Sequence, residues 1–154
     1  MRGYLLFFTF FVCLSFTKAQ TGLFNKVKLR LQQTHPEIVL DNKLIAINVW
    51  QLSDVRSREL NKDFEKAAQV YQVAKLKGGT KGLIVVCVNR DHLTAEAVVA
   101  MSKDGIVKSV SLSLDELTEA AAIKNIVFDM YGNEVYADLE SGQAYPSIQK
   151  LITR

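Results

Sequence analysis

The chain has 154 residues, of which 49% are hydrophobic and 23% are charged, and its formal net charge is +3 at pH 7. This length suits one domain that buries a substantial core. Two basic residues, Arg2 and Lys18, lie in a predicted N-terminal leader. The remainder is therefore close to neutral, which gives no electrostatic case for nucleic-acid binding.

Residues 1–19 have the pattern of a secretory signal peptide. A positively charged start precedes an apolar run from Leu5 to Phe16, and the segment ends at the small residue Ala19. This pattern predicts cleavage before Gln20 and export, to the periplasm in a Gram-negative bacterium and otherwise out of the cell. An uncleaved anchor is the alternative, although the run is shorter than the roughly 20 apolar residues that span a bilayer.

The rest of the sequence predicts strands and helices that alternate along the chain. Continuous apolar runs indicate strands buried on both faces, and apolar residues three and four apart indicate amphipathic helices. The predicted strands are 38–40, 44–50, 82–88, 106–112, 126–129 and 134–137. The predicted helices are 21–33, which could run into an extended segment, 58–74, 93–101, 113–121 and one opened by residues 145–146. The alternation predicts a central mixed sheet with helices on both faces.

Local signals mark the ends of several elements. Asp91 precedes the helix 93–101 and can cap it. Ser113 and Glu116 have the spacing of a capping box. Gly132 lies in the turn between the last two strands and is free to adopt a positive φ. Pro146 is tolerated in the first turn of the final helix.

Trp50 stands at the end of a long apolar strand, and Asp129 and Gly132 form a strand–turn hairpin further along. The segment 44–60 resembles the active-site strand, turn and helix of the thioredoxin-like family, in its secreted thiol-disulfide oxidoreductase branch. The resemblance covers residues 38–154 and implies an α/β fold, the thioredoxin-like three-layer α/β/α sandwich with a central mixed sheet. Residues 20–37 would be an N-terminal extension. We expect it to pack as a helix on its own domain, with a partner or a membrane surface as the alternative.

The resemblance fails where the family performs its chemistry. Asp54 and Ser57 occupy the positions that it assigns to the two cysteines of the CxxC motif. The family's cis-proline position falls on Ile123, for which the cis bond costs about 2.5–4 kcal/mol. The chain thus resembles a redox scaffold without a dithiol, and we expect no catalytic residues and no cofactor. We expect no metal site either, because His35 and His92 have no cysteine at ligand spacing.

The leading hypothesis is an exported, redox-inactive thioredoxin-like domain that binds a protein or peptide partner in the cell envelope. Asp54 is expected to cap the helix that follows it, or else to form a polar recognition patch with Arg56 and Ser57. The predicted binding residues are Trp50, Gln51, Asp54, Ser57, Ile123 and Lys124.

Two alternatives remain open from the sequence. The first is a weak thiol oxidoreductase or peroxidase that uses Cys87, the only cysteine outside the leader. Against it, Cys87 lies in an apolar strand, where a thiol is expected to be buried and inert. The second is a different small α/β binding domain, in which residues 44–50 and 82–88 do not form a parallel pair.

Overall fold

Five strands form one mixed sheet in the order β3-β2-β1-β4-β5. The computed structural model describes residues 22–74, 82–91 and 95–151. The strands are β1 (Leu44–Trp50), β2 (Leu83–Asn89), β3 (Val110–Ser113), β4 (Asn125–Phe128) and β5 (Glu134–Ala137). The helices are residues 22–34, α2 (Val55–Tyr71), α3 (Ala95–Lys103), α4 (Ala144–Gln149) and the 3-10 helices η2 (Leu114–Glu116) and η3 (Thr118–Ala122).

β1 lies at the centre of the sheet, between one parallel and one antiparallel neighbour. It pairs in parallel with β2, where Leu44 lies opposite Leu83, and antiparallel with β4, where Ile45 lies opposite Phe128. All seven residues of β1 and all seven of β2 are buried, as expected for strands covered on both faces. The parallel pair excludes the alternative α/β domain that would lack it.

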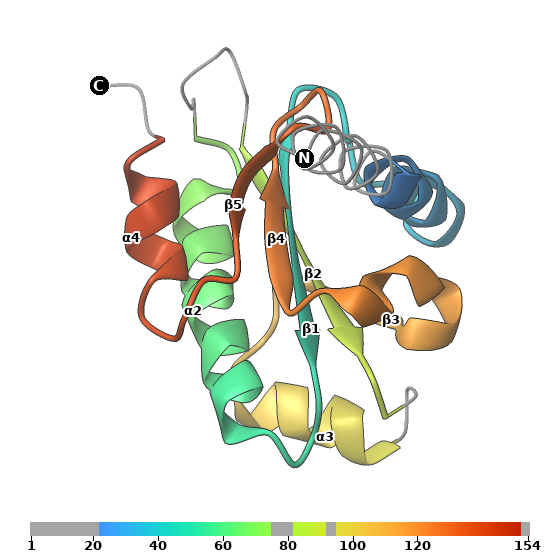
Figure 1. Cartoon of the computed structure of the whole chain (residues 1–154), viewed down its shortest axis with the longest axis vertical. Helices are drawn as coiled ribbons and strands as arrows, with labels where there is room; N and C mark the ends of the chain where they lie inside the picture. Colours follow the sequence, from blue (N-terminus) through green and yellow to red (C-terminus); the bar gives the residue numbers. More distant parts are fainter. Residues whose placement is uncertain (1–21, 75–81, 92–94, 152–154) are drawn as a thin grey trace, which may run out of the picture.

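Helices cover both faces of the sheet, as Figure 1 shows. On one face, Phe64 of α2 and Ile148 of α4 belong to the hydrophobic core. On the other face, Val27 and Leu31 of the helix 22–34 are fully buried in a second core with Ile47 of β1. The predicted three-layer α/β/α architecture is confirmed. The N-terminal helix packs on its own domain because its apolar stripe completes this second core.

The hairpin between β4 and β5 has a glycine where the N-terminal helix approaches it closely. Gly132 has a φ of +87°, and a Cβ there would lie 2.7 Å from the Phe24 ring. That ring packs edge-on against Phe128, with centroids 5.5 Å apart. The positive φ predicted for Gly132 is confirmed, and the missing side chain also makes room for Phe24.

Several predicted element boundaries were wrong. Residues 38–40 form no strand; the Ile38 amide donates to the His35 carbonyl, and only Leu40 is buried. α2 begins at Val55 rather than at residue 58, because Asp54 caps it. β3 begins at Val110 rather than at residue 106, because the amides of the two preceding residues donate hydrogen bonds to a side chain of α2 instead of to a strand. The predicted helix 113–121 is instead two 3-10 helices, which are separated at Leu117.

Other predictions fall wholly or partly outside the described residues. These are the leader 1–19, the capping partners of Asp91 at residues 92–94, and the apolar residue Ile152 of the last helix. The Glu116 half of the capping box is confirmed, because its carboxylate accepts the Ser113 amide at 2.7 Å. None of the helices within residues 22–74, 82–91 and 95–151 combines the length and apolar character needed to cross a membrane.

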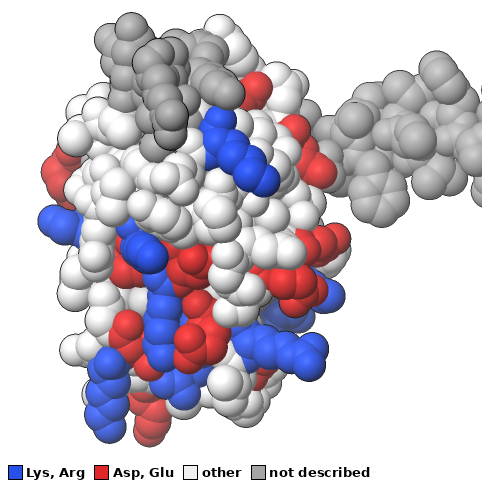
Figure 2. All heavy atoms as spheres, turned by 90° about the vertical axis from the view of Figure 1, so that its left-hand side faces the viewer, with Lys and Arg blue, Asp and Glu red and all other residues white. Residues whose placement is uncertain are grey.

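The outer face of α2 and α4 carries charges of both signs. Figure 2 shows lysine and arginine side chains interspersed with acidic ones over the lower half of this face. Arg58 bonds Asp104 through two 2.9 Å contacts, and Lys62 bonds Glu59 at 2.7 Å. Neighbouring charges of opposite sign compensate one another here, as the near-neutral composition indicates.

Candidate functional site

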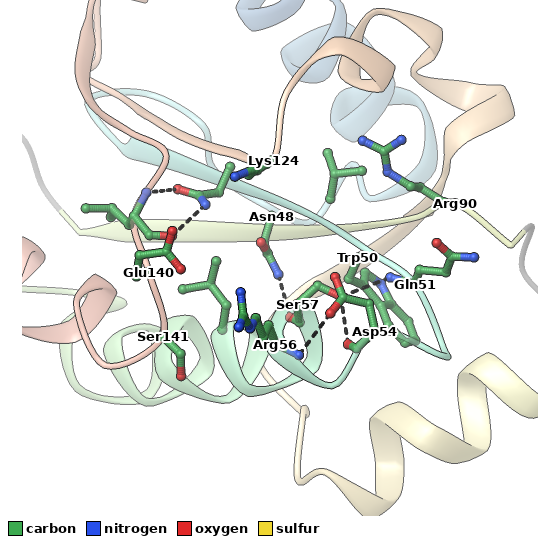
Figure 3. Close-up of a pocket in the computed structure, with 14 residues that line it drawn as sticks. Asn48, Trp50, Gln51, Asp54, Arg56, Ser57, Arg90, Lys124, Glu140 and Ser141 are labelled. Atoms are coloured by element: carbon green, nitrogen blue, oxygen red, sulfur yellow. Dashed lines mark hydrogen bonds between the residues drawn. The ribbon is translucent and has the colours of Figure 1, made fainter.

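A cleft of about 460 Å³ opens at the carboxyl end of β1, where the chain turns into α2. Figure 3 shows this cleft between the first turn of α2 and the segment that leads into β4. It is lined by Asn48, Val49, Trp50, Gln51, Asp54, Arg56, Ser57, Leu60, Arg90, Lys124, Asn125, Leu139, Glu140 and Ser141. The predicted Trp50, Gln51, Asp54 and Ser57 thus lie together with Lys124, which is far from them in the sequence.

Asp54 caps α2 with its carboxylate. The backbone at Asp54 is extended, and its Oδ1 accepts the Arg56 amide at 3.0 Å. One of the helix's unpaired amides is thereby satisfied. The carboxylate is exposed and lies at the positive end of the helix dipole. The predicted capping role of Asp54 is confirmed.

The Ser57 hydroxyl is held within the same turn. It donates to the Asp54 carbonyl at 3.0 Å and accepts the Gln51 amide at 3.2 Å. The Asp54 amide in turn donates to the Gln51 carbonyl at 3.1 Å. Ser57 therefore has no basic side chain bonded to it that could activate its hydroxyl as a nucleophile. Its hydrogen bonds fix the backbone of the turn.

The floor of the cleft contains a buried asparagine that the sequence predictions overlooked. Asn48 is 1% exposed. Its Nδ2 donates to the Ser57 carbonyl at 3.1 Å and to Asn61 Oδ1 at 2.6 Å. Its Oδ1 is buried and has no hydrogen-bond partner among the residues that the structure describes. A polar residue in the otherwise apolar strand 44–50 was the signal that could have identified it.

The opposite wall of the cleft is the segment that leads into β4, and hydrogen bonds to the backbone of neighbouring segments hold it in place. The Val49 amide donates to the Lys124 carbonyl at 2.8 Å. Asn125 donates to the Leu139 carbonyl at 2.9 Å and accepts the Leu139 amide at 2.8 Å. This pair of hydrogen bonds between a side chain and the backbone fixes the position of the loop that carries Glu140 and Ser141.

Arg90 secures the loop before β4 from the side of β2. Its Nη2 donates to the carbonyls of Ala121 and Ile123 at 3.1 and 3.2 Å. Ile123 has an extended backbone, and no peptide bond within the described residues is cis. Its side chain packs against the second hydrophobic core and does not line the cleft. The structure thus separates Ile123 from the other five predicted binding residues.

The cleft carries charges of both signs. Asp54 and Glu140 face it together with Arg56, Arg90 and Lys124. Within the described part of the chain, no group of three or more histidine, cysteine, aspartate or glutamate residues is placed to hold a metal ion.

No protein-family model and no curated protein matches the sequence, whereas several solved structures do. The thioredoxin domain of a thiol-disulfide oxidoreductase from Bacteroides vulgatus is 17% identical, with a TM-score of 0.56 over 74% of this chain and 82% of that one. A thiol:disulfide interchange protein from a Bacteroides species is 17% identical, with a TM-score of 0.56 over 71% and 73%. A secreted thiol-disulfide isomerase from Corynebacterium glutamicum is 16% identical, with a TM-score of 0.54 over 73% and 70%.

The chain has a thioredoxin-like fold. At this level of identity the likeness establishes the architecture and not the activity. Within the thioredoxin-like fold, Trp50 ends the central strand, Asp54 caps the helix that follows it, and Ser57 lies in the first turn of that helix. The resemblance inferred from residues 44–60 is therefore confirmed at the level of the fold.

Cys87 lies apart from the cleft of this thioredoxin-like domain. It sits in the middle of β2, is fully buried and belongs to the core beneath α2. Burial, reinforced by the nearby Glu65 carboxylate and opposed by a hydrogen bond with Ser109, raises the pKa of the thiol to about 12. A thiol with such a pKa is almost entirely protonated at neutral pH and is a poor nucleophile.

Proposed function

We propose that this protein is an exported, redox-inactive thioredoxin-like module that binds a protein or peptide partner in the cell envelope. The observation that carries the proposal is the pair of oxygen side chains, Asp54 and Ser57, at the turn between β1 and α2. Disulfide exchange needs an attacking thiolate and a second thiol that resolves the mixed disulfide. None of the residues that line the cleft is a cysteine.

The proposal is also supported by the way in which the turn is stabilised. A thiolate at the start of a helix is stabilised by the helix dipole. Here the Asp54 carboxylate supplies the negative charge and accepts a backbone amide. The turn is therefore stable without a sulfur atom, and it leaves an open cleft for binding.

The shape and lining of the cleft favour a polypeptide ligand. Its walls offer the apolar Val49 and Leu60 together with charged groups of both signs at Asp54 and Lys124. Such a mixture suits a partner that presents apolar and polar groups in alternation, as an extended peptide does. Export is supported by the signal-peptide pattern of residues 1–19 and by the C. glutamicum structural neighbour, which is described as secreted.

A dithiol-exchange assay with a gain-of-function control tests redox inactivity. Purified protein should not accelerate the reduction of insulin by dithiothreitol above a Cys87→Ser control, because Cys87 is buried. The matched variant Asp54→Cys/Ser57→Cys restores two thiols at the turn and should acquire exchange activity. Wild-type activity that matches this double variant would disprove the proposal. Wild-type activity that disappears only in Cys87→Ser would support the alternative enzyme.

Site-specific photocrosslinking tests partner binding. A photoreactive residue at Gln51, which is exposed at the rim of the cleft, should crosslink an envelope protein in intact cells. Tyr131, which is 71% exposed in the β4–β5 hairpin and does not line the cleft, is the matched control position. Adducts of equal yield at both positions would argue against the cleft as the binding surface.

A further inference from the structure

Two buried polar atoms on residues that line the cleft lack a hydrogen-bond partner within the described part of the chain. The described residues contain three buried side-chain atoms of this kind: Asn48 Oδ1, Trp50 Nε1 and Ser111 Oγ. Asn48 and Trp50 line the cleft, and Ser111 does not. An unpaired polar atom in a folded interior costs roughly 1–3 kcal/mol, so its presence at a cleft indicates capacity for a ligand.

The orientation of the Asn48 amide follows from its neighbours. The Ser57 carbonyl, 3.1 Å from Nδ2, can only accept a hydrogen bond, so the nitrogen must face α2. In Figure 3 the Asn48 nitrogen points to Ser57 and the oxygen lies on the other branch of the amide. The atom left without a partner is therefore an acceptor, which calls for a donor from the ligand.

We propose that Asn48 Oδ1 accepts a hydrogen bond from a neutral side-chain carboxamide of the bound peptide, so that the cleft selects segments containing asparagine or glutamine. This inference rests on the proposed peptide-binding function. A neutral donor is favoured over an ammonium group because Asn48 is only 1% exposed. A cation buried there without a carboxylate in contact would lose its hydration uncompensated.

Trp50 gives a reason to favour a carboxamide over a hydroxyl group. Residues 48 and 50 project from the same face of β1, about 7 Å apart along the strand. The unpaired atom is an acceptor on Asn48 and a donor on Trp50. A carboxamide carries its donor and its acceptor on two separate atoms, whereas a hydroxyl offers both on one oxygen, so a carboxamide is better suited to pair with two separate groups.

Selection from a randomised peptide library tests the inference. Peptides recovered on immobilised wild-type protein should be enriched in asparagine or glutamine at one position. Asn48→Asp places a carboxylate at the same point and should shift the preference at that position to lysine or arginine. Ser102→Ala, on the exposed side of α3 and outside the cleft, is the control and should select the same peptides as the wild type.

A double-mutant cycle with one selected peptide provides the second measurement. Replacing its carboxamide residue by leucine or methionine should weaken binding to the wild type about five- to tenfold, as one hydrogen bond implies. The same change should have little effect on binding to Asn48→Leu, if that variant melts cooperatively. Should Asn48→Leu not fold, the cycle is run with Asn48→Ala, which also lacks the acceptor and against which the carboxamide should likewise lose its advantage.

The two proposals fail in different ways. Recovery of peptides without any carboxamide preference, or an equal loss of affinity on wild type and variant, would overturn the inference and leave peptide binding intact. Failure of the wild type to enrich any peptide above the bare matrix would overturn both.

Discussion

Two buried polar clusters lie on the same face of the sheet, and they differ in how completely their hydrogen bonds are satisfied. Glu65 in the middle of α2 is 3% exposed and accepts four hydrogen bonds. Asn48 in β1 is 1% exposed, and its oxygen accepts none. The carboxylate in the cluster around Glu65 has its hydrogen-bonding capacity filled, and the cluster stabilises the fold. The cluster around Asn48 lies at a cleft and retains capacity for a ligand.

The Glu65 cluster explains why β3 is shorter than the alternating pattern predicted. Oε1 accepts the Lys108 amide at 2.8 Å, and Oε2 accepts the amide and the hydroxyl of Ser109 at 2.9 and 2.7 Å. The backbone amides thus donate hydrogen bonds to a side chain of α2 instead of to a neighbouring strand. Burial raises the pKa of Glu65, but the hydrogen bonds from Ser109, Lys108 and Gln69 outweigh it, so the pKa lies below its ordinary value.

Removing the Glu65 carboxylate should have the largest effect on stability. Glu65→Gln is nearly isosteric, yet its NH2 group replaces one carboxylate oxygen and so turns a donor toward the donors of either Lys108 or Ser109. We expect the free energy of unfolding to fall by about 2–3 kcal/mol, since buried donors lose a charged acceptor. Chemical denaturation measures this loss in the free energy of unfolding. The control is Glu59→Gln on the exposed face of α2, expected to cost less than about 0.5 kcal/mol. Equal losses would contradict the interpretation that the cluster around Glu65 stabilises the fold.

The same cluster predicts a specific dependence of stability on pH. Because the folded-state pKa of Glu65 is depressed, its contribution is fully present above the unfolded-state pKa of about 4.3. That contribution is lost as the pH falls through the lower pKa of the folded state. Wild type should therefore lose stability between about pH 5 and pH 3, and Glu65→Gln should lose less over that range. Parallel pH profiles of the two proteins would show that other carboxylates dominate acid unfolding.

Asn48 should contribute less to stability than Glu65. Asn48→Leu removes the donor that bonds the Ser57 carbonyl and the Asn61 oxygen, but it also removes an unsatisfied acceptor from the interior. We expect a net loss of about 1 kcal/mol in the free energy of unfolding. Thermal and chemical melts should place it between wild type and Glu65→Gln. A loss as large as that of Glu65→Gln would mean that Asn48 is mainly a structural residue.

Substitution of Asp54 tests the cap of α2, and we expect it to have the smallest effect on stability. Asp54→Ala removes the acceptor of the Arg56 amide and should lower the free energy of unfolding by about 1 kcal/mol, visible as a lower melting temperature. Asp54→Asn keeps an oxygen acceptor and serves as the matched control, with a smaller loss. An unchanged melting temperature in Asp54→Ala would contradict the capping contribution.

The sequence alone was sufficient to predict the architecture and most features of the segment that joins β1 to α2. The apolar runs in β1 and β2 predicted strands covered on both faces, because such strands have no polar alternation. Asp54 was recognisable as a cap from its place before an amphipathic helix. Gly132 was recognisable from its turn. These features depend on residues close together in the chain, so local patterns report them.

The remaining features depend on contacts between distant segments. Glu65 and the backbone of residues 108–109 are more than forty residues apart, and no local pattern predicts their bonds. Ile123 adjoins Lys124, yet only the packed structure shows that it faces the second core while Lys124 lines the cleft. The sequence by itself determined the fold, most of its elements and the absence of cysteine from the segment between β1 and α2. Only the tertiary structure decided which polar groups are satisfied and which remain unpaired, because hydrogen bonding in the interior is set by which segments packing brings together.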